Sequence, residues 1–293
     1  MGAEQQISPL VAIVGQTGSG KSALAMRLAE HFSGEIIAAD SRTVYVGMDI
    51  GTAKPTVVER GRVRHFGLDV VTPDQPFNVY DFKQLADRAI ADISSRGRLP
   101  LLVGGSGLYV DAVVFDYAFG PAPDSDMRAA LDGLSVEELQ SRVLAGGLPM
   151  PENSRNPRHL ARVLESGTIL RQPRRLRPNT LLLGLQPSLD QLRSRLEARA
   201  GAMLAAGLIE ETQEIVAGYG EREAFRTPAY KAVMAYLQGE IGLPAIGDAI
   251  VANDLKFAKR QRTWFRRNVC IHWLNNRDTF AESVDLITTL LNK

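Results

Sequence analysis

A glycine-rich segment at residues 15–22, with the sequence GQTGSGKS, constrains this chain more than any other feature. It matches the G-x4-G-K-S pattern of a phosphate-binding loop, follows the apolar run 10–14 and precedes a helical pattern. Glycines let backbone N–H groups turn toward an anion, and the helix N-terminus adds a favourable dipole. Lys21 can reach the terminal phosphates, and Ser22 can hold a Mg²⁺ ion. The loop therefore predicts a phosphate or diphosphate site without specifying the reaction.

The length and composition exclude several classes of protein. A chain of 293 residues allows one large α/β domain or a core with an inserted subdomain. The net charge of +1 is too small to indicate any particular class of binding partner. The single cysteine, Cys270, excludes an internal disulfide and a cysteine-based zinc site, and is typical of the cytoplasm. We see neither a signal peptide nor an apolar run near the roughly 20 residues of a membrane span, so we expect no membrane association.

Strand and helix patterns alternate along most of the chain. Strands are predicted at 10–14, 35–39, 99–103, 181–185 and 269–273, and helices at 21–32, 81–96, 188–206, after 207 and at 248–267. This alternation predicts an α/β fold, with a P-loop NTPase-like parallel sheet flanked by helices. Ligands of such sheets lie at the carboxyl ends of the strands. Three strands should bring Gly15, Asp40 and Gly104 to that edge.

The composition changes in the middle of the chain. Residues 120–126 (GPAPDSD) resemble a linker, and residues 127–178 contain helical fragments without a clear strand. We therefore predict an α-helical insertion at 120–178 within a catalytic core formed by 7–119 and 179–293.

Asp40 and the segment 48–55 are candidate functional features near the loop. A carboxylate at the end of a strand suits a magnesium-ordering group, a general base or a simple turn cap. In the segment 48–55 (MDIGTAKP), Thr52 and Lys54 can donate to phosphate or nucleic acid, unless the segment is an ordinary solvated loop.

The strand 99–103 ends in Gly-Gly-Ser-Gly rather than in an acidic residue. An ATPase normally places a metal-holding carboxylate there. The glycines permit close approach of a ligand, and Ser106 offers one hydrogen bond. This end of the strand suits a site for a bulky planar group.

Two segments are rich in basic residues. Residues 155–177 contain seven arginines and one acid, and a second stripe follows the predicted helix 248–267, with Lys256, Lys259, Arg260, Arg262, Arg266 and Arg267. Either stripe alone is as compatible with a solvated face as with a ligand. Two such segments in a nearly neutral chain favour an RNA partner.

Taken together, the motifs resemble those of the tRNA dimethylallyltransferase family, also called tRNA isopentenyltransferases. The matching segments, in family order, are GQTGSGKS (15–22), EIIAADS (35–41), VYVGMDIGTAKP (44–55), GRLPLLVGGSGLY (97–109), NPRHLARVLES (156–166) and AKRQRTWFR (258–266). Ser106 stands where the family usually has Thr, and Asp254-Leu255 stand where it usually has Thr-Arg.

The resemblance implies transfer of a dimethylallyl group from dimethylallyl diphosphate to N6 of the adenosine 3′-adjacent to the anticodon, in tRNAs reading codons that begin with U. Asp40 would be the general base, Ser106 would lie near the adenine, and Arg226 would clamp the diphosphate together with the loop residues Gly15, Gln16, Thr17, Gly18, Ser19, Gly20, Lys21 and Ser22. Mg²⁺, held by Ser22, would neutralise the leaving group. The chain would act as a cytoplasmic monomer.

The resemblance also implies positions that contact the tRNA anticodon stem-loop. These are Asp40, Ser41, Arg42, Thr43, Ser106, Arg128, Arg158, His159, Leu160, Ala161 and Arg162. Three alternatives remain at this stage: a cytokinin-forming adenosine-phosphate isopentenyltransferase, a P-loop kinase of a small metabolite, and a non-catalytic tRNA-binding relative.

Overall fold

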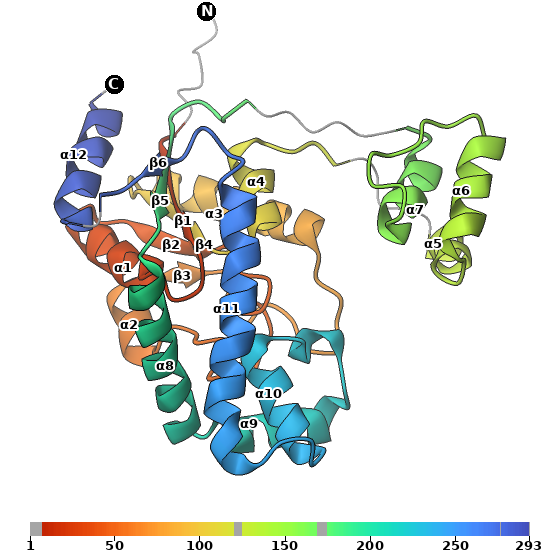
Figure 1. Cartoon of the computed structure of the whole chain (residues 1–293). Helices are drawn as coiled ribbons and strands as arrows, with labels where there is room; N and C mark the ends of the chain where they lie inside the picture. Colours follow the sequence, from red (N-terminus) through yellow and green to blue (C-terminus); the bar gives the residue numbers. More distant parts are fainter. Residues whose placement is uncertain (1–7, 120–124, 169–174, 276, 293) are drawn as a thin grey trace, which may run out of the picture. The chain divides into compact units, whose positions relative to one another are not determined.

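The computed structural model describes residues 8–119, 125–168, 175–275 and 277–292 (Figure 1). The chain packs as two units, one formed by 1–114 together with 176–293 and the other by 115–175. The expected boundaries at 120 and 178 thus differ from the packing boundaries by a few residues. Within the described ranges, no helix is long and apolar enough to cross a membrane.

The first unit is built on a six-stranded parallel sheet with the order β3-β2-β4-β1-β5-β6. Its strands are β1 (Leu10–Gly15), β2 (Glu35–Ala38), β3 (His65–Phe66), β4 (Pro100–Gly104), β5 (Thr180–Leu185) and β6 (His272–Trp273). β1 is buried along its whole length between β4 and β5, where Ile13 lies opposite Val103 and Leu183. A fully apolar, doubly covered central strand is what a parallel sheet requires.

Helices cover the sheet (Figure 1). Several of them also form a second apolar cluster of their own. The helices of this unit are α1 (Lys21–His31), α2 (Val57–Arg62), α3 (Val79–Ser95), α4 (Gly107–Val114), α8 (Leu189–Ala205), α9 (Leu208–Tyr219), α10 (Pro228–Leu237), α11 (Ile246–Phe265) and α12 (Thr279–Leu291), with short 3₁₀ helices at Glu223–Phe225 (η1) and Leu243–Ala245 (η2). Leu24 and Leu28 of α1 pack with Ile287 of α12 against the sheet. Helices α8, α10 and α11 share a separate core.

The structure confirms the predicted fold class and adds elements that the sequence patterns did not indicate. Ser188 caps α8 through a capping box with Gln191. The helix predicted at 248–267 is α11, but α10 and α12 were missed, and so were α2 and α4. Helix α4 was missed because it begins within the Gly-Gly-Ser-Gly turn, whose glycines are not typical of a helix. Helix α2 was missed because six residues are too few for a helical pattern to be recognised.

The second unit is a small helical bundle. It contains α5 (Ser125–Asp132), α6 (Val136–Ala145) and α7 (Pro157–Ser166). Its core combines Leu139 and Val143 of α6 with Leu160 and Val163 of α7. The described residues of this unit contain helices and no strand, in agreement with the helical prediction for this region.

Candidate functional site

The P-loop, residues 15–22, connects β1 to α1 (Figure 1). Gly18 and Gly20 have φ values of 78° and 92°, a conformation that residues with a Cβ rarely adopt. The Ser19 N–H donates to the Gln16 carbonyl at 3.0 Å, which closes the turn. The next helix, α1, begins at Lys21, so that its N-terminus points into the loop. This is the geometry of an anion site at a helix N-terminus.

Gln261 of α11 links the P-loop to the end of β4. Its Oε1 accepts a hydrogen bond from the Thr17 N–H at 2.8 Å, and its Nε2 donates to the Gly105 carbonyl at 3.0 Å. Gln261 is buried, so both of its bonds are shielded from water. The sequence reasoning did not identify this residue, although it lies within the AKRQRTWFR segment.

Asp40 and Ser106 lie on adjoining turns after β2 and β4. Asp40 Oδ1 accepts from the Arg42 N–H at 2.9 Å, and the Ser106 hydroxyl accepts from the Ser41 N–H at 2.9 Å. A Cβ on Gly104 would lie 1.9 Å from the Ala39 carbonyl oxygen, so the close approach of the two strand ends needs glycine. The predicted convergence of Gly15, Asp40 and Gly104 is therefore present, and Asp40 also serves as a turn cap.

Two cavities of the first unit meet beside the P-loop. The larger has a volume of about 970 Å³ and the smaller about 310 Å³. Thr17, Asp40, Thr52 and Arg199 line both. Lys21, Ser22, Met26, Leu68 and Val103 belong to the smaller cavity, whereas Arg226, Lys256 and Arg260 belong to the larger. A ligand in each cavity would meet the other next to the Asp40 carboxylate.

The charge arrangement around Lys21 favours an anion. Burial lowers the pKa of Lys21 to about 8, while Asp40 opposes this shift and Arg199 adds to it. Asp254 of α11 also faces this group; burial raises its pKa, and Arg199 and Lys21 act in the opposite direction. Two cations thus lie close together with buried or half-buried acids around them. Neither Arg199 nor Asp254 was predicted, because isolated charges on amphipathic helices give no sequence signal.

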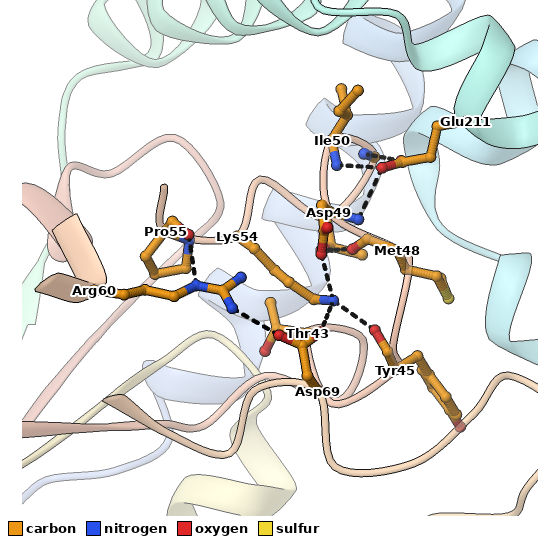
Figure 2. Close-up of polar contacts among 12 residues, drawn as sticks. Thr43, Tyr45, Met48, Asp49, Ile50, Lys54, Pro55, Arg60, Asp69 and Glu211 are labelled. Atoms are coloured by element: carbon orange, nitrogen blue, oxygen red, sulfur yellow. Dashed lines mark hydrogen bonds and ion pairs between the residues drawn. The ribbon is translucent and has the colours of Figure 1, made fainter. Parts of the chain in front are cut away.

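The segment 48–55 is held in place by Glu211 of α9 (Figure 2). The Glu211 carboxylate accepts the backbone N–H groups of Asp49, Ile50 and Gly51 at 2.9, 2.7 and 2.9 Å. It also accepts the Tyr230 hydroxyl at 2.7 Å. A Cβ on Gly51 would lie 2.4 Å from the Tyr230 ring, which explains the glycine at this position.

The structure corrects the interpretation of Lys54 as a phosphate or nucleic-acid donor. Its Nζ donates to the Tyr45 carbonyl and to the carboxylates of Asp49 and Asp69, at 2.5, 2.7 and 2.6 Å (Figure 2). An ammonium group has three protons, so all its donors are used. Lys54 therefore holds the segment together. Thr52, whose hydroxyl donates to the Met48 carbonyl at 2.5 Å, lines both cavities.

The positions expected to contact tRNA fall into two groups. Arg158, His159 and Arg162 are exposed on α7, whereas Leu160 and Ala161 are buried in the core of the second unit. The expectation for these two side chains is corrected, because every turn of an amphipathic helix has inward positions. Arg128 forms an ion pair of 3.0 Å with Glu165. In the first unit, Thr43 is buried, and Arg42 donates to the Glu223 carbonyl at 3.0 Å.

The two basic stripes are not uniform surfaces. Arg171 and Arg174 of the 155–177 stripe lie outside the described residues. On α11, Lys256 and Arg260 line the larger cavity. Arg267 lies after the end of that helix, where its guanidinium stacks 4.6 Å from the centre of the Trp264 ring. Part of each stripe is thus available to a polyanion.

Comparison with known proteins identifies the family. Residues 43–268 match the IPP transferase family. Curated relatives include tRNA dimethylallyltransferase 2 of Geotalea daltonii, 39% identical over 96% of this chain and 91% of that protein, and tRNA dimethylallyltransferase of Pelotomaculum thermopropionicum, 38% identical over 94% and 93%.

Solved structures agree with this assignment. The full-length tRNA isopentenylpyrophosphate transferase of Bacillus halodurans has a TM-score of 0.74 at 34% identity and covers 97% of both chains. A eukaryotic dimethylallyltransferase acting on tRNA has a TM-score of 0.80, with 96% of this chain and 80% of that one covered, and at 23% identity it supports the fold alone. The chain belongs to the IPP transferase, or tRNA dimethylallyltransferase, family of prenyltransferases.

Proposed function

We propose that this protein transfers a dimethylallyl group from dimethylallyl diphosphate to N6 of the adenosine 3′-adjacent to the anticodon, in tRNAs reading codons that begin with U. Family membership supports the reaction class. The observation that carries the proposal is the meeting of two cavities at Asp40 and Thr17, one of them lined by the P-loop lysine. Two substrates entering from the two cavities would meet beside a carboxylate.

The donor's diphosphate would bind to the P-loop. The α1 N-terminus and the Lys21 ammonium provide complementary charge. Arg226 follows η1 and lines the larger cavity, from which its guanidinium would clamp the same diphosphate. These groups stabilise the negative charge that develops on the leaving diphosphate. The apolar side chains of Met26, Leu68 and Val103 line the smaller cavity beside them.

The residues present fit a Mg²⁺ ion that is held mainly by its substrate. Ser22 is exposed in the first turn of α1, next to Lys21. Among the described residues, no cluster of three or more His, Cys, Asp or Glu side chains forms a metal cage. Mg²⁺ commonly takes few protein ligands and completes its shell with phosphate oxygens and water. Ser22 would hold it, and the bound ion would neutralise part of the diphosphate charge.

The transfer step requires a base beside the exocyclic amine. The N6 nitrogen would attack C1 of the dimethylallyl group, the C1–O bond would break, and the diphosphate would leave with its electron pair. Asp40 would accept the proton from N6, since it lines both cavities and its carboxylate is oriented by the Arg42 N–H. Ser106 is fixed next to it by the Ser41 N–H and would contact the adenine.

The acceptor would enter through the larger cavity. A volume of about 970 Å³, with Lys256 and Arg260 on its walls, suits an extruded nucleotide and its phosphates. In the second unit, the exposed basic residues of α7 would bind the anticodon stem. One chain supplies both cavities, so we propose that the enzyme acts as a monomer.

A transfer assay tests this function. Purified protein is incubated with radiolabelled dimethylallyl diphosphate and Mg²⁺, and unmodified tRNA and AMP are offered in parallel. We expect label in tRNA, at the adenosine next to the anticodon after nuclease digestion. Label only in AMP would reassign the chain to the cytokinin-forming class. The absence of label in both, with tight tRNA binding, would identify a non-catalytic relative.

A further inference from the structure

Helix α8 directs two arginines, one turn apart, toward the P-loop. Arg195 donates from Nη1 to the Ser19 carbonyl at 2.9 Å. Leu192 and Leu196 of the same helix are buried, and both lie 3.0 Å from the position that a Cβ on Gly18 would occupy. The helix is therefore packed directly against the loop. This packing fixes where Arg199, one turn after Arg195, places its guanidinium.

Arg199 has an unused donor at the junction of the two cavities. Its side chain lines both, and its Nε is buried without a hydrogen-bond partner among the described residues. A buried donor without an acceptor is unfavourable, so a ligand that supplies an acceptor at this point would gain from the contact. The hydroxyl of Ser19, in the P-loop itself, is also buried without a partner among those residues. Of these two atoms, the Arg199 Nε belongs to a side chain that lines both cavities.

Arg199 lies close to a second cation, Lys21, and to a buried acid, Asp254. Arg199 and Lys21 are close enough for their like charges to repel, which contributes to the lowered pKa of Lys21. Asp254 is 3% exposed, lines the larger cavity and faces both cations from α11. Asp40 also faces Lys21, so two carboxylates and two cations lie at the junction of the cavities. A diphosphate would compete with these carboxylates for Arg199 and Lys21.

We propose that Arg199 is a further diphosphate-binding residue, which holds the donor's diphosphate together with Lys21, and that Asp254, with Asp40, balances these two cations while the site is empty. The assignment rests on the proposed function, because it names a residue for the donor of that reaction. A guanidinium suits this task because its planar array of donors can bind two phosphate oxygens at once. Diphosphate entry would offset the attraction of Asp254 for the cations, and its carboxylate would then oppose the bound anion.

Calorimetric titration with inorganic pyrophosphate and Mg²⁺ tests the assignment. We expect Arg199→Gln to weaken pyrophosphate binding roughly ten- to a hundredfold, the scale of a lost charge-assisted hydrogen bond. Arg193→Gln, an exposed position on the same helix, is the matched control and should bind like the wild type. Arg199→Lys keeps the charge and should recover part of the affinity. In the transfer assay, Arg199→Gln should raise the KM for the prenyl donor and leave the KM for tRNA unchanged.

Asp254→Asn provides a second, opposite test. Removing a carboxylate that faces the bound diphosphate should tighten pyrophosphate binding several-fold, whereas Asp248→Asn, exposed in the first turn of the same helix, should not. Equal pyrophosphate affinity in folded Arg199→Gln or Arg199→Lys and in the wild type would overturn the assignment. A wild-type chain that bound no pyrophosphate and transferred no prenyl group would instead defeat the proposed function itself.

Discussion

The side chain of Gln261 accepts the Thr17 N–H at 2.8 Å across 244 residues of sequence. Its amide nitrogen donates to the Gly105 carbonyl at 3.0 Å, so one buried side chain connects the P-loop to the turn after β4. A Cβ on Gly105 would lie 2.3 Å from that nitrogen, which leaves glycine as the residue that fits. Helix α11 thereby fixes the distance between the phosphate loop and the Ser106 turn.

Replacing Gln261 should loosen both turns at once. Gln261→Leu keeps the volume and removes both hydrogen bonds, leaving the Thr17 N–H and the Gly105 carbonyl unpaired. We expect the free energy of unfolding to fall by about 2–4 kcal/mol, since each buried unsatisfied group costs about 1–3 kcal/mol. Urea denaturation measures this loss, with exposed Lys259→Ala of the same helix as control. Equal stabilities of the two variants would contradict the bridging role.

Asp40→Asn should separate catalysis from donor binding. The amide oxygen of asparagine can still accept the Arg42 N–H, so the turn should survive, but the side chain cannot take the N6 proton. We expect kcat to fall about a hundredfold or more, the scale of a lost general base, with pyrophosphate affinity changed little. Single-turnover transfer to tRNA measures the rate. A near-normal rate would eliminate Asp40 as the base.

Replacing Lys54 with Met should lower the free energy of unfolding without weakening pyrophosphate binding. The change removes three hydrogen bonds from a buried ammonium and leaves Asp49 without this partner. We expect the free energy of unfolding to fall by about 2–4 kcal/mol. Breaking a buried ion pair usually costs about 3–5 kcal/mol, and the loss should be smaller here because Asp69 retains its ion pair with Arg60.

The matched control for Lys54 is an exposed ion pair. Arg62→Ala removes the pair with Glu30 and should cost at most about 1 kcal/mol in urea denaturation. If Lys54→Met instead kept full stability and lost pyrophosphate affinity, the ammonium would be a ligand group, and its structural assignment would be wrong.

Exposed arginines of the second unit should contribute to tRNA binding and not to binding of the prenyl donor. The triple variant Arg155→Ala, Arg158→Ala, Arg162→Ala should raise the KM for tRNA and flatten its salt dependence, because fewer phosphate contacts release fewer counterions. Exposed Arg88→Ala of α3 is the single-site control. The KM for the prenyl donor should stay constant in all variants, and a parallel rise in both KM values would point to a folding defect.

The sequence revealed those parts of the site that lie on continuous motifs. The P-loop, the end of β2 at Asp40 and the Gly-Gly-Ser-Gly turn are short segments whose residues act on near neighbours, so spacing alone predicted their common edge. Leu160 and Ala161 were expected to contact tRNA, but their side chains are buried. A match to a family segment does not show which of its residues face inward.

Contacts between distant elements could not be predicted in this way. Glu211 holds three N–H groups about 160 positions away, and Arg199 of α8 lines both cavities beside the P-loop. Lys54 appeared to be a ligand group because its three partners, Tyr45, Asp49 and Asp69, become visible only when the loop is folded. Packing, rather than local propensity, determines these roles.

Pyrophosphate binding should weaken as Lys21 loses its proton. Burial holds the pKa of Lys21 at about 8 in the folded chain, against 10.5 in the unfolded one. The unfolded chain therefore binds more protons between these values, and the free energy of unfolding should rise with pH across that window. Affinity should change in the opposite direction, because the diphosphate requires the charged amine. Between pH 8 and 9 the protonated fraction falls from about one half to about one tenth, so we expect a roughly fivefold loss.

The control for this pH effect is Lys21→Met, which has no proton to lose. Pyrophosphate changes its own ionisation over the same range, and Asp40, Arg199 and Asp254 face the site in both proteins. These contributions are shared, so the ratio of wild-type to Lys21→Met affinity isolates the amine. That ratio should decline from pH 7.5 to 9.5 in calorimetric titrations. A ratio that stays constant would mean that Lys21 keeps its proton throughout, as an ammonium already stabilised by its neighbours would.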